Sequence, residues 1–227
     1  MNLPLRDHYD RFGARQDRQA WYEDKALDAL IRHGRFEDAS RVIELGCGTG
    51  RYAARLFADH LPEHARYLGL DISETMVALA RRRLVAWEAR AQVRQSDGAI
   101  TFAEDNASAD RVVATYVADL LSVAEQRALV DEAARVLQPG GLLLMASLDR
   151  DPPGVARLTA AAWQLAHRMT PLRVGGCRPV ALRPLIDEAR WSVAHMSRVT
   201  SWGLGSQVLI AQRTDAAYPR TERTARP

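Results

Sequence analysis

The 227-residue chain has only two cysteines, Cys47 and Cys177, and they do not form a CxxC pair. A disulfide framework is therefore excluded, and a reducing, cytoplasmic setting is the expectation. No apolar run approaches the roughly 18 residues that a membrane-spanning helix requires, so we expect no integral membrane association. Charged residues crowd the first thirty positions, so we also expect no signal peptide.

The chain also lacks a strong charge imbalance, because its formal net charge is only +3. Much of this charge lies in a tail after Gln212 that has almost no apolar content, and we expect residues 214–227 to be disordered. The length suits a single domain, which we place at residues 1–213. No second domain or basic face is evident, so no nucleic-acid partner is expected. The sequence leaves the oligomeric state open.

Short apolar segments alternate with segments of helical periodicity, which is typical of an α/β fold with a mostly parallel sheet. We expect strands at 41–45, 67–70, 91–95, 111–116 and 142–147, and a final hairpin formed by 191–200 and 206–213. We expect helices at 17–33, 51–61, 73–87, 123–137, 154–168 and 184–189. Ser73 is a suitable N-cap for the third of these helices.

A glycine-rich turn, Glu44-Leu45-Gly46-Cys47-Gly48-Thr49-Gly50, joins the first strand to a helix. Glycines let a ligand approach the backbone closely, and the helix N-terminus offers unpaired N–H groups. A dinucleotide site requires G-x-G-x-x-G, but here the third glycine comes one residue early and Arg51 occupies its place. A Lys-Ser/Thr pair is also missing, so the turn favours neither a dinucleotide site nor a P-loop.

Acidic residues stand at the ends of the next two strands. Asp71 is placed to accept hydrogen bonds from ribose hydroxyls, although it would also serve as a helix cap. Asp97 is followed by Gly98, and a carboxylate beside a backbone N–H would suit the amine and ring nitrogen of adenine; the alternative is an ordinary turn residue. Nothing in this pattern suggests a pyrophosphate, so it fits a ligand made of adenine, ribose and an amino acid.

Residues 40–147 resemble the class I S-adenosylmethionine-dependent methyltransferases, in the small-molecule branch that includes quinone and phospholipid methylases. The resemblance rests on five segments in order: VIELGCGTGRY (42–52), LGLDIS (68–73), QSDG (95–98), DRVVATYVADLL (110–121) and RVLQPGGLLLMAS (135–147). It implies a Rossmann-like, doubly wound, mostly parallel seven-stranded sheet with a C-terminal antiparallel hairpin. It also implies S-adenosylmethionine as the cofactor.

The resemblance implies roles for residues around the methionine part of the cofactor. Gly46, Cys47 and Gly48 would contact it through their backbone. Glu44 would lie beneath the turn and orient the amino group. Tyr116 would lie near the sulfonium and the incoming nucleophile, either as a catalytic residue or as a residue that only fills the pocket.

The resemblance also implies roles around the adenosine part. Asp71 would bind the ribose, and Ile72 would pack on the adenine. Asp97 and Gly98 would bind the adenine. The match weakens before residue 40 and within 149–181, where such enzymes build their substrate sites.

Residues 1–35 are expected to form a helical lid, because the stretch 8–13 resembles a mobile segment that covers the cofactor in related enzymes. Tyr9 would then close over the methionine end. Residues 149–181 are expected to form a substrate-side insertion whose apolar residues suggest a small, apolar acceptor: Trp163, Met169, Leu172 and Val174.

Methyl transfer from a sulfonium needs a general base only if the nucleophile keeps its proton until attack. Three histidines are candidates, namely His8, His167 and His195, and His167 is preferred because it lies in the irregular insertion. The spacing of His60 and His64 is interrupted by Pro62, so no metal site is expected.

Three other functions compete with this interpretation. A methyltransferase acting on RNA or protein would carry a recognition domain or a basic face. A nicotinamide-dependent oxidoreductase is opposed by the early third glycine. A scaffold that binds the cofactor without catalysis would share every motif. The sequence leaves open the acceptor molecule and its reacting atom.

Overall fold

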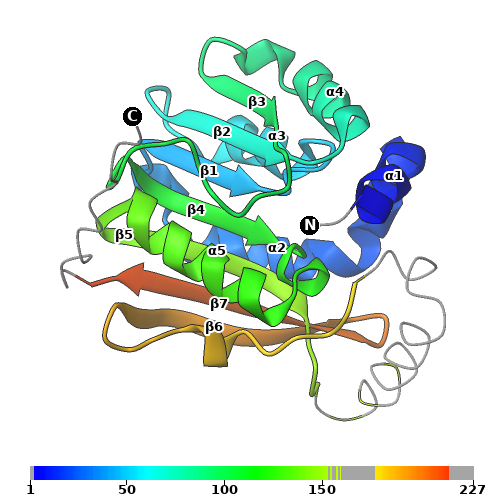
Figure 1. Ribbon diagram of the computed structural model, residues 1–227, viewed down its shortest axis with the longest axis vertical. Coiled ribbons are helices and arrows are strands. Elements are labelled where there is room, and N and C mark those ends of the chain that lie inside the picture. Colours follow the sequence, from blue (N-terminus) through cyan, green and yellow to red (C-terminus); the bar gives the residue numbers. More distant parts are fainter. Residues whose placement is uncertain (1–2, 153, 155–156, 158, 160–176, 215–227) are drawn as a thin grey trace, which may run out of the picture.

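The computed structural model describes residues 3–152, 154, 157, 159 and 177–214. Seven strands form one sheet in the order β3-β2-β1-β4-β5-β7-β6 (Figure 1). The pairs from β3 to β5 are parallel, and β7 is antiparallel to both β5 and β6. The prediction of a mostly parallel, seven-stranded sheet with a C-terminal antiparallel hairpin is therefore confirmed.

The strands are β1 (Arg41–Leu45), β2 (Arg66–Asp71), β3 (Ala91–Gln95), β4 (Ala109–Thr115), β5 (Leu137–Leu148), β6 (Trp191–Ser201) and β7 (Leu204–Arg213). The α-helices are α1 (Leu3–Phe12), α2 (Ala20–His33), α3 (Arg51–Asp59), α4 (Glu74–Arg83) and α5 (Val123–Val136). Short 3-10 helices are η1 (Gly13–Gln19), η2 (Phe36–Asp38), η3 (Val85–Trp87), η4 (Ala118–Leu120) and η6 (Arg183–Leu185).

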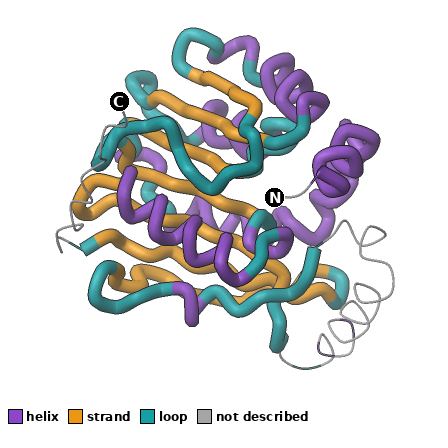
Figure 2. Tube along the Cα trace, in the orientation of Figure 1, coloured by secondary structure: helices purple, strands orange, loops and turns teal. Residues whose placement is uncertain are grey.

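The sheet is buried on both faces, as Figure 2 shows for the helices that cover it. Successive side chains of a strand point to opposite faces, so Leu142 and Leu144 of β5 pack in one core with α2, α3 and α4. Leu143 and Met145 pack in a second core with α5. This two-sided burial explains why β5 is apolar in every position from Leu142 to Ala146.

Local sequence signals explain several helix ends. The Ser73 hydroxyl accepts a hydrogen bond from the Met76 N–H at 3.1 Å, which confirms its predicted role as the N-cap of α4. Ser122 and Glu125 form a reciprocal capping box at the start of α5, a device that satisfies two backbone donors at once.

Three predicted helices were wrong in their extent. The helix predicted for 73–87 ends at Arg83, because the chain tightens into η3 before turning into β3. The helix predicted for 184–189 is only the 3-10 turn Arg183–Leu185, followed by a turn in which the Asp187 carboxylate accepts from the Ala189 N–H. The first part of 17–33 is also 3-10. The helix predicted for 154–168 lies almost wholly outside the described residues.

The chain reverses its winding direction between β1 and β4. Strands β2 and β3 extend the sheet to one side of β1, whereas β4 and β5 extend it to the other. Open sheets of this kind bind ligands at such a switch point, beyond the carboxyl ends of the strands. In Figure 1 the helix α1 lies beyond these ends, which positions the N-terminal segment beside the expected site.

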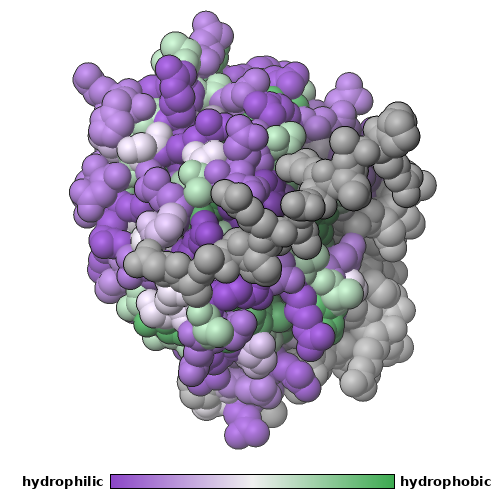
Figure 3. Space-filling view, turned by 60° about the vertical axis from the view of Figure 1, so that its left-hand side comes forward, coloured by the Kyte–Doolittle hydropathy of each residue, from purple (hydrophilic) through white to green (hydrophobic). Residues whose placement is uncertain are grey.

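The described surface in Figure 3 is mostly hydrophilic, with apolar side chains in small separate areas on this face. Within the part of the chain that the structure describes, none of the helices has both the length and the apolar character to cross a membrane.

Candidate functional site

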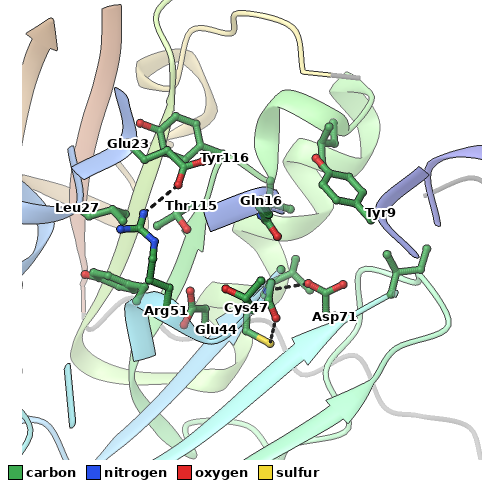
Figure 4. A pocket seen from close by; sticks show the side chains of 18 of the residues that line it. Tyr9, Gln16, Glu23, Leu27, Glu44, Cys47, Arg51, Asp71, Thr115 and Tyr116 are labelled. Atoms are coloured by element: carbon green, nitrogen blue, oxygen red, sulfur yellow. Dashed lines mark hydrogen bonds and ion pairs between the residues drawn. The ribbon is translucent and has the colours of Figure 1, made fainter. Parts of the chain in front are cut away.

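A cavity of about 950 Å³, including its open mouth, lies at the carboxyl ends of β1, β2 and β4 (Figure 4). It is lined by residues from the glycine turn, the strand ends and the N-terminal helices. The structure brings most of the predicted site residues together here: Tyr9, Glu44, Gly46, Cys47, Gly48, Asp71, Ile72 and Tyr116.

The glycine turn is fastened to the end of β2. The backbone N–H groups of Gly46 and Cys47 both donate to the Leu70 carbonyl oxygen, at 2.7 and 3.1 Å. Gly46 has φ +70°, a left-handed conformation that side chains disfavour. A Cβ atom at Gly46 would lie only 2.4 Å from Cγ2 of Val117. The turn therefore requires glycine for two reasons, backbone conformation and close approach.

We expect Gly46→Ala to destabilise the fold by about 1–3 kcal/mol, because it combines backbone strain with a clash. Gly140→Ala is the matched control, since Gly140 has φ +79° but a Cβ atom there would meet only the flexible Gln212 side chain, at 3.8 Å. Chemical denaturation of both variants separates the two costs. Equal loss of stability in both would contradict the clash with Val117.

Asp71 connects the turn to the start of α4. Its Oδ2 accepts from the Gly48 N–H at 2.8 Å, and its Oδ1 accepts from the Ser73 N–H at 2.9 Å. Burial raises the pKa of this carboxyl above its ordinary value, although the two N–H donors oppose the shift. Each oxygen retains another lone pair, so hydroxyls of a ligand can still bind to it.

Glu44 lies beneath the turn and is almost wholly buried. Its Oε2 accepts a hydrogen bond from the Tyr67 hydroxyl at 2.7 Å. Burial raises the pKa of Glu44 to about 8, and the nearby Asp71 charge adds to the effect. A buried carboxyl of this kind is poised to ionise when a cation arrives beside it.

Tyr116 directly follows β4 and has φ +57°, an unusual conformation for a tyrosine. Its hydroxyl is 3.0 Å from Oγ of Ser206, and its ring packs edge-on against Tyr22 at 5.7 Å. Burial raises the pKa of this phenol above its ordinary range. The Tyr116 hydroxyl is therefore neutral at physiological pH and suits a hydrogen-bonding or packing role.

Asp97 and Gly98 are not among the residues that line the cavity, whereas their neighbour Ser96 is. Asp97 is exposed, and its Oδ1 accepts from the Ala99 N–H at 2.8 Å, as in a turn. Gly98 is buried with φ +90°. Their contact with adenine stays a prediction. His167 and the apolar residues predicted for the insertion lie outside the described residues.

The N-terminal segment covers the glycine turn. Tyr9 of α1 lines the cavity, and the neighbouring Asp10 accepts from the Ser73 hydroxyl at 2.5 Å. After α1, Asp17 accepts from the Thr49 hydroxyl at 2.6 Å and forms an ion pair with Arg83. The segment is thus joined to both the turn and α4 by polar contacts, and its action as a lid stays a prediction.

Several lining residues escape the sequence reasoning. Glu23 and Arg51 form an ion pair of 3.1 Å at the cavity wall. The glycine motif points to Arg51 only as an obstacle to dinucleotide binding. Helical periodicity around Tyr22 and Leu27 marks one apolar face of α2, but nothing in it shows that Glu23 faces a cavity. Cys177 also lines the cavity, and it follows a stretch that the sequence leaves unreadable.

Residues 42–141 match the model of a methyltransferase domain family. Over this segment the chain is similar to a methyltransferase domain. The match spans β1 to the start of β5 and includes the glycine turn, Asp71 and Tyr116. The resemblance stated from the sequence motifs is therefore confirmed.

Two curated relatives each match part of the chain. The chain is 33% identical over 143 residues to trans-aconitate 2-methyltransferase of Variovorax paradoxus, which is 62% of this chain and 52% of the relative. It is 32% identical over 107 residues to carboxy-S-adenosyl-L-methionine synthase of Salmonella paratyphi C, which is 47% of this chain and 42% of the relative. The matches thus span about half the length of these relatives or less.

The fold also matches a solved structure of an O-methyltransferase family protein from Burkholderia thailandensis. The TM-score is 0.66 at 21% identity, and the match covers 86% of this chain and 57% of that one. At this identity the likeness concerns the fold alone. The sheet of this chain is thereby supported by a solved structure as well.

Proposed function

We propose that the protein is an S-adenosylmethionine-dependent methyltransferase that acts on a small, apolar molecule. The observation that carries the proposal is the cavity in which the glycine turn, Asp71 and Glu44 meet. Family membership of residues 42–141 supports it. The two relatives are named for different reactions. We therefore infer the reaction of this protein from its own site and not from the relatives.

The described residues fit S-adenosylmethionine in charge and in hydrogen bonding. The ligand carries positive charge on its sulfonium and amino groups, and the cavity has four acidic side chains, which can ionise beside a cation, against one guanidinium: Asp17, Glu23, Glu44 and Asp71 against Arg51. Oε1 of Gln16 is buried without a hydrogen-bond partner and lies beside Gly48. It is therefore available to a donor such as the ligand's amino group.

We assign Asp71 to the ribose, Ile72, Asp97 and Gly98 to the adenine, and Glu44 to the amino group. The backbone of Gly46, Cys47 and Gly48 would face the methionine part. When bound, the sulfonium supplies a methyl group whose transfer is an in-line displacement with a neutral leaving group. The protein then has to align the acceptor with this methyl and keep water away.

The acceptor would lie at the Tyr116 end of the cavity. Rings and aliphatic side chains line this region and favour an apolar molecule: Tyr9, Tyr22, Leu27, Tyr116 and Leu120.

Three further proposals accompany this one. Residues 149–181 complete the acceptor site and include His167 as a candidate base, the domain extends over 1–213, and the protein acts in the cytoplasm without a nucleic-acid partner.

Isothermal titration calorimetry with S-adenosylmethionine, S-adenosylhomocysteine and NAD tests the cofactor. We expect binding of the first two in the micromolar range and none of NAD.

A screen for S-adenosylhomocysteine release with alcohols, phenols, amines, thiols and carboxylic acids tests the reaction. Binding of NAD alone would overturn the proposal, and binding without turnover of any acceptor would support the silent scaffold instead.

Deletion of residues 1–16 is expected to lower turnover while the domain stays folded, because α1 packs mainly on α4 and η1 rather than in the sheet. The cavity then loses Tyr9 and Gln16, and water reaches the reacting atoms more freely. Circular dichroism checks the fold, and Tyr9→Ala tests the ring alone. Full activity of the truncated protein would contradict the lid.

A further inference from the structure

A carboxylate without a role in cofactor binding lies at the acceptor end of the cavity. Glu23 of α2 lines the cavity wall, and its side chain is 12% exposed. In Figure 4 it lies beside Tyr116, whereas Asp71 lies on the far side of the glycine turn. Because Asp71 is assigned to the ribose and Tyr116 to the neighbourhood of the sulfonium, Glu23 lies on the side from which the methyl group is transferred.

The charge of Glu23 is only partly compensated. Nη2 of Arg51 lies 3.1 Å from its Oε2, but Nη1 of the same guanidinium donates to Asp24 at 2.5 Å. Glu23 thus shares this cation with Asp24, which also lies 3.6 Å from Nη1 of Arg55. Burial outweighs this partner and raises the pKa of Glu23 to about 7. Near neutral pH the carboxyl can therefore both take up and release a proton.

The other groups around Glu23 are poorer proton acceptors. The ionisable side chains that act on it come from several elements: Tyr22, Asp24, Arg51, Tyr116, Asp119 and Cys177. Burial raises the pKa of the two phenols and of the thiol, so these groups stay neutral. Asp119 does not line the cavity, and its Oδ2 already accepts from the Leu148 N–H.

We propose that Glu23 is a catalytic residue that accepts the proton of the methyl acceptor, and that the acceptor group is a hydroxyl or an amine N–H. This inference rests on the proposed methyl transfer. The acceptor oxygen or nitrogen forms a bond to the methyl carbon, and the carbon–sulfur bond breaks with its electron pair going to sulfur. The acceptor's proton passes to the Glu23 carboxylate and later to solvent. Arg51 acts as a positioning residue that holds this carboxylate.

The same lining disfavours an anionic acceptor. A carboxylate or phosphate would meet the only partly compensated charge of Glu23, and it brings no proton for this residue to take. Among the lining residues that the structure describes, the only cation is Arg51, and both of its terminal nitrogens are engaged. A neutral hydroxyl or an amine meets neither obstacle.

The first test needs no acceptor. Affinities of wild type, Glu23→Gln and the control Asp24→Asn are measured calorimetrically for S-adenosylmethionine and S-adenosylhomocysteine at pH 6 and pH 8. Only the first ligand has a positive sulfur, so an ionised Glu23 at the methyl-transfer end favours it. We expect the preference for S-adenosylmethionine to fall about threefold or more at pH 8 in Glu23→Gln. The control removes the other partner of Arg51 and should keep the preference.

The pH comparison isolates the titration of Glu23. The preference of the wild type for S-adenosylmethionine over S-adenosylhomocysteine should increase from pH 6 to pH 8. Any change that comes from ionisation of the ligands themselves also occurs in Glu23→Gln, so the difference between the two proteins reports the titration of Glu23. An unchanged preference in Glu23→Gln would overturn the proposal. An equal loss of affinity for both ligands would assign Glu23 to cofactor binding and overturn it as well. If neither ligand binds to the wild type, the proposed function itself fails.

The second test uses the acceptor screen with a matched series of benzyl alcohol, phenol, benzylamine and benzoate. We expect methylation of a hydroxyl or an amine. The kcat of the wild type should rise as the pH increases through 7, and kcat should be lower by about a hundredfold or more in Glu23→Gln. Glu23→Asp retains the carboxylate and should recover part of the rate, also if the glutamine variant folds poorly. A methyl ester as the main product, or a glutamine variant with wild-type kcat, would overturn the proposal.

Discussion

Replacing Asp71 by alanine is expected to weaken the binding of S-adenosylmethionine by about tenfold to a hundredfold, or roughly 1.4–3 kcal/mol. Two losses add up. The assigned ribose hydroxyls lose an acceptor, and the Gly48 and Ser73 N–H groups lose the carboxylate that holds them at 2.8 and 2.9 Å. The structure thus predicts a larger effect than ribose contact alone, because the same side chain shapes the turn.

Two further variants identify the cause of this loss. Asp71→Asn keeps one acceptor oxygen but places an N–H₂ group against one of the two backbone donors, so we expect an intermediate loss of affinity. Asp59→Ala removes an exposed carboxylate at the end of α3 and should have no effect. Titration calorimetry gives the affinities, and circular dichroism verifies the fold. Wild-type affinity of a folded Asp71→Ala protein would refute the ribose assignment.

The strands that position the site could be predicted because their signals are local. The apolar segment of β1 runs directly into the glycines, Asp71 ends β2, and Asp97 follows the end of β3 by two residues. In a parallel sheet, the carboxyl ends of neighbouring strands meet at one edge. Strand order therefore follows once the motif order is recognised, and the cavity at that edge follows from the order.

The acceptor end could not be predicted, because it depends on contacts distant in sequence. Glu23 lines the cavity wall beside Arg51, which lies 28 residues later in the sequence. Tyr116 finds its partner Ser206 across 90 residues. Neither pairing has a local sequence signal. The glycine turn does have one, since Gly46, Gly48 and Gly50 lie within five consecutive residues.

The pattern also misjudged where helices end. The positions of Val77, Ala80, Leu84 and Trp87 fit one helical face, yet α4 ends at Arg83 and Trp87 packs from a 3-10 turn against Phe57. Hydrophobic periodicity reports which residues reach the core. It does not report the backbone hydrogen bonds that end a helix, so an apolar residue can continue the pattern beyond the end.

Replacing Glu44 by glutamine is expected to stabilise the protein at pH 8 by roughly 4–5 kcal/mol. The pKa of Glu44 is about 8 in the folded state, whereas an unfolded glutamate ionises near pH 4.3. The folded state thus holds its proton more tightly, and wild-type stability falls as the pH rises from about 4.5 through 8. Glutamine cannot ionise, and its carbonyl oxygen can still accept from the Tyr67 hydroxyl.

Denaturant unfolding at pH 5 and pH 8 measures this difference. The advantage of Glu44→Gln should be large at pH 8 and small at pH 5, where the wild-type carboxyl is protonated in the folded state. Glu23 and Asp119, with pKa values of about 7, act in the same direction, so some pH dependence remains in the variant. A variant less stable than wild type at pH 8 would contradict a buried, destabilising charge.

The same substitution should weaken S-adenosylmethionine binding by about tenfold, because the cationic amino group loses its assigned partner. In the wild type at pH 7, arrival of this cation would drive Glu44 to ionise, so binding should release a proton. Calorimetry in buffers of different ionisation enthalpy detects that proton, and Glu44→Gln should release less. A residue that lowers stability in the free protein and raises affinity in the complex is kept for binding rather than for folding.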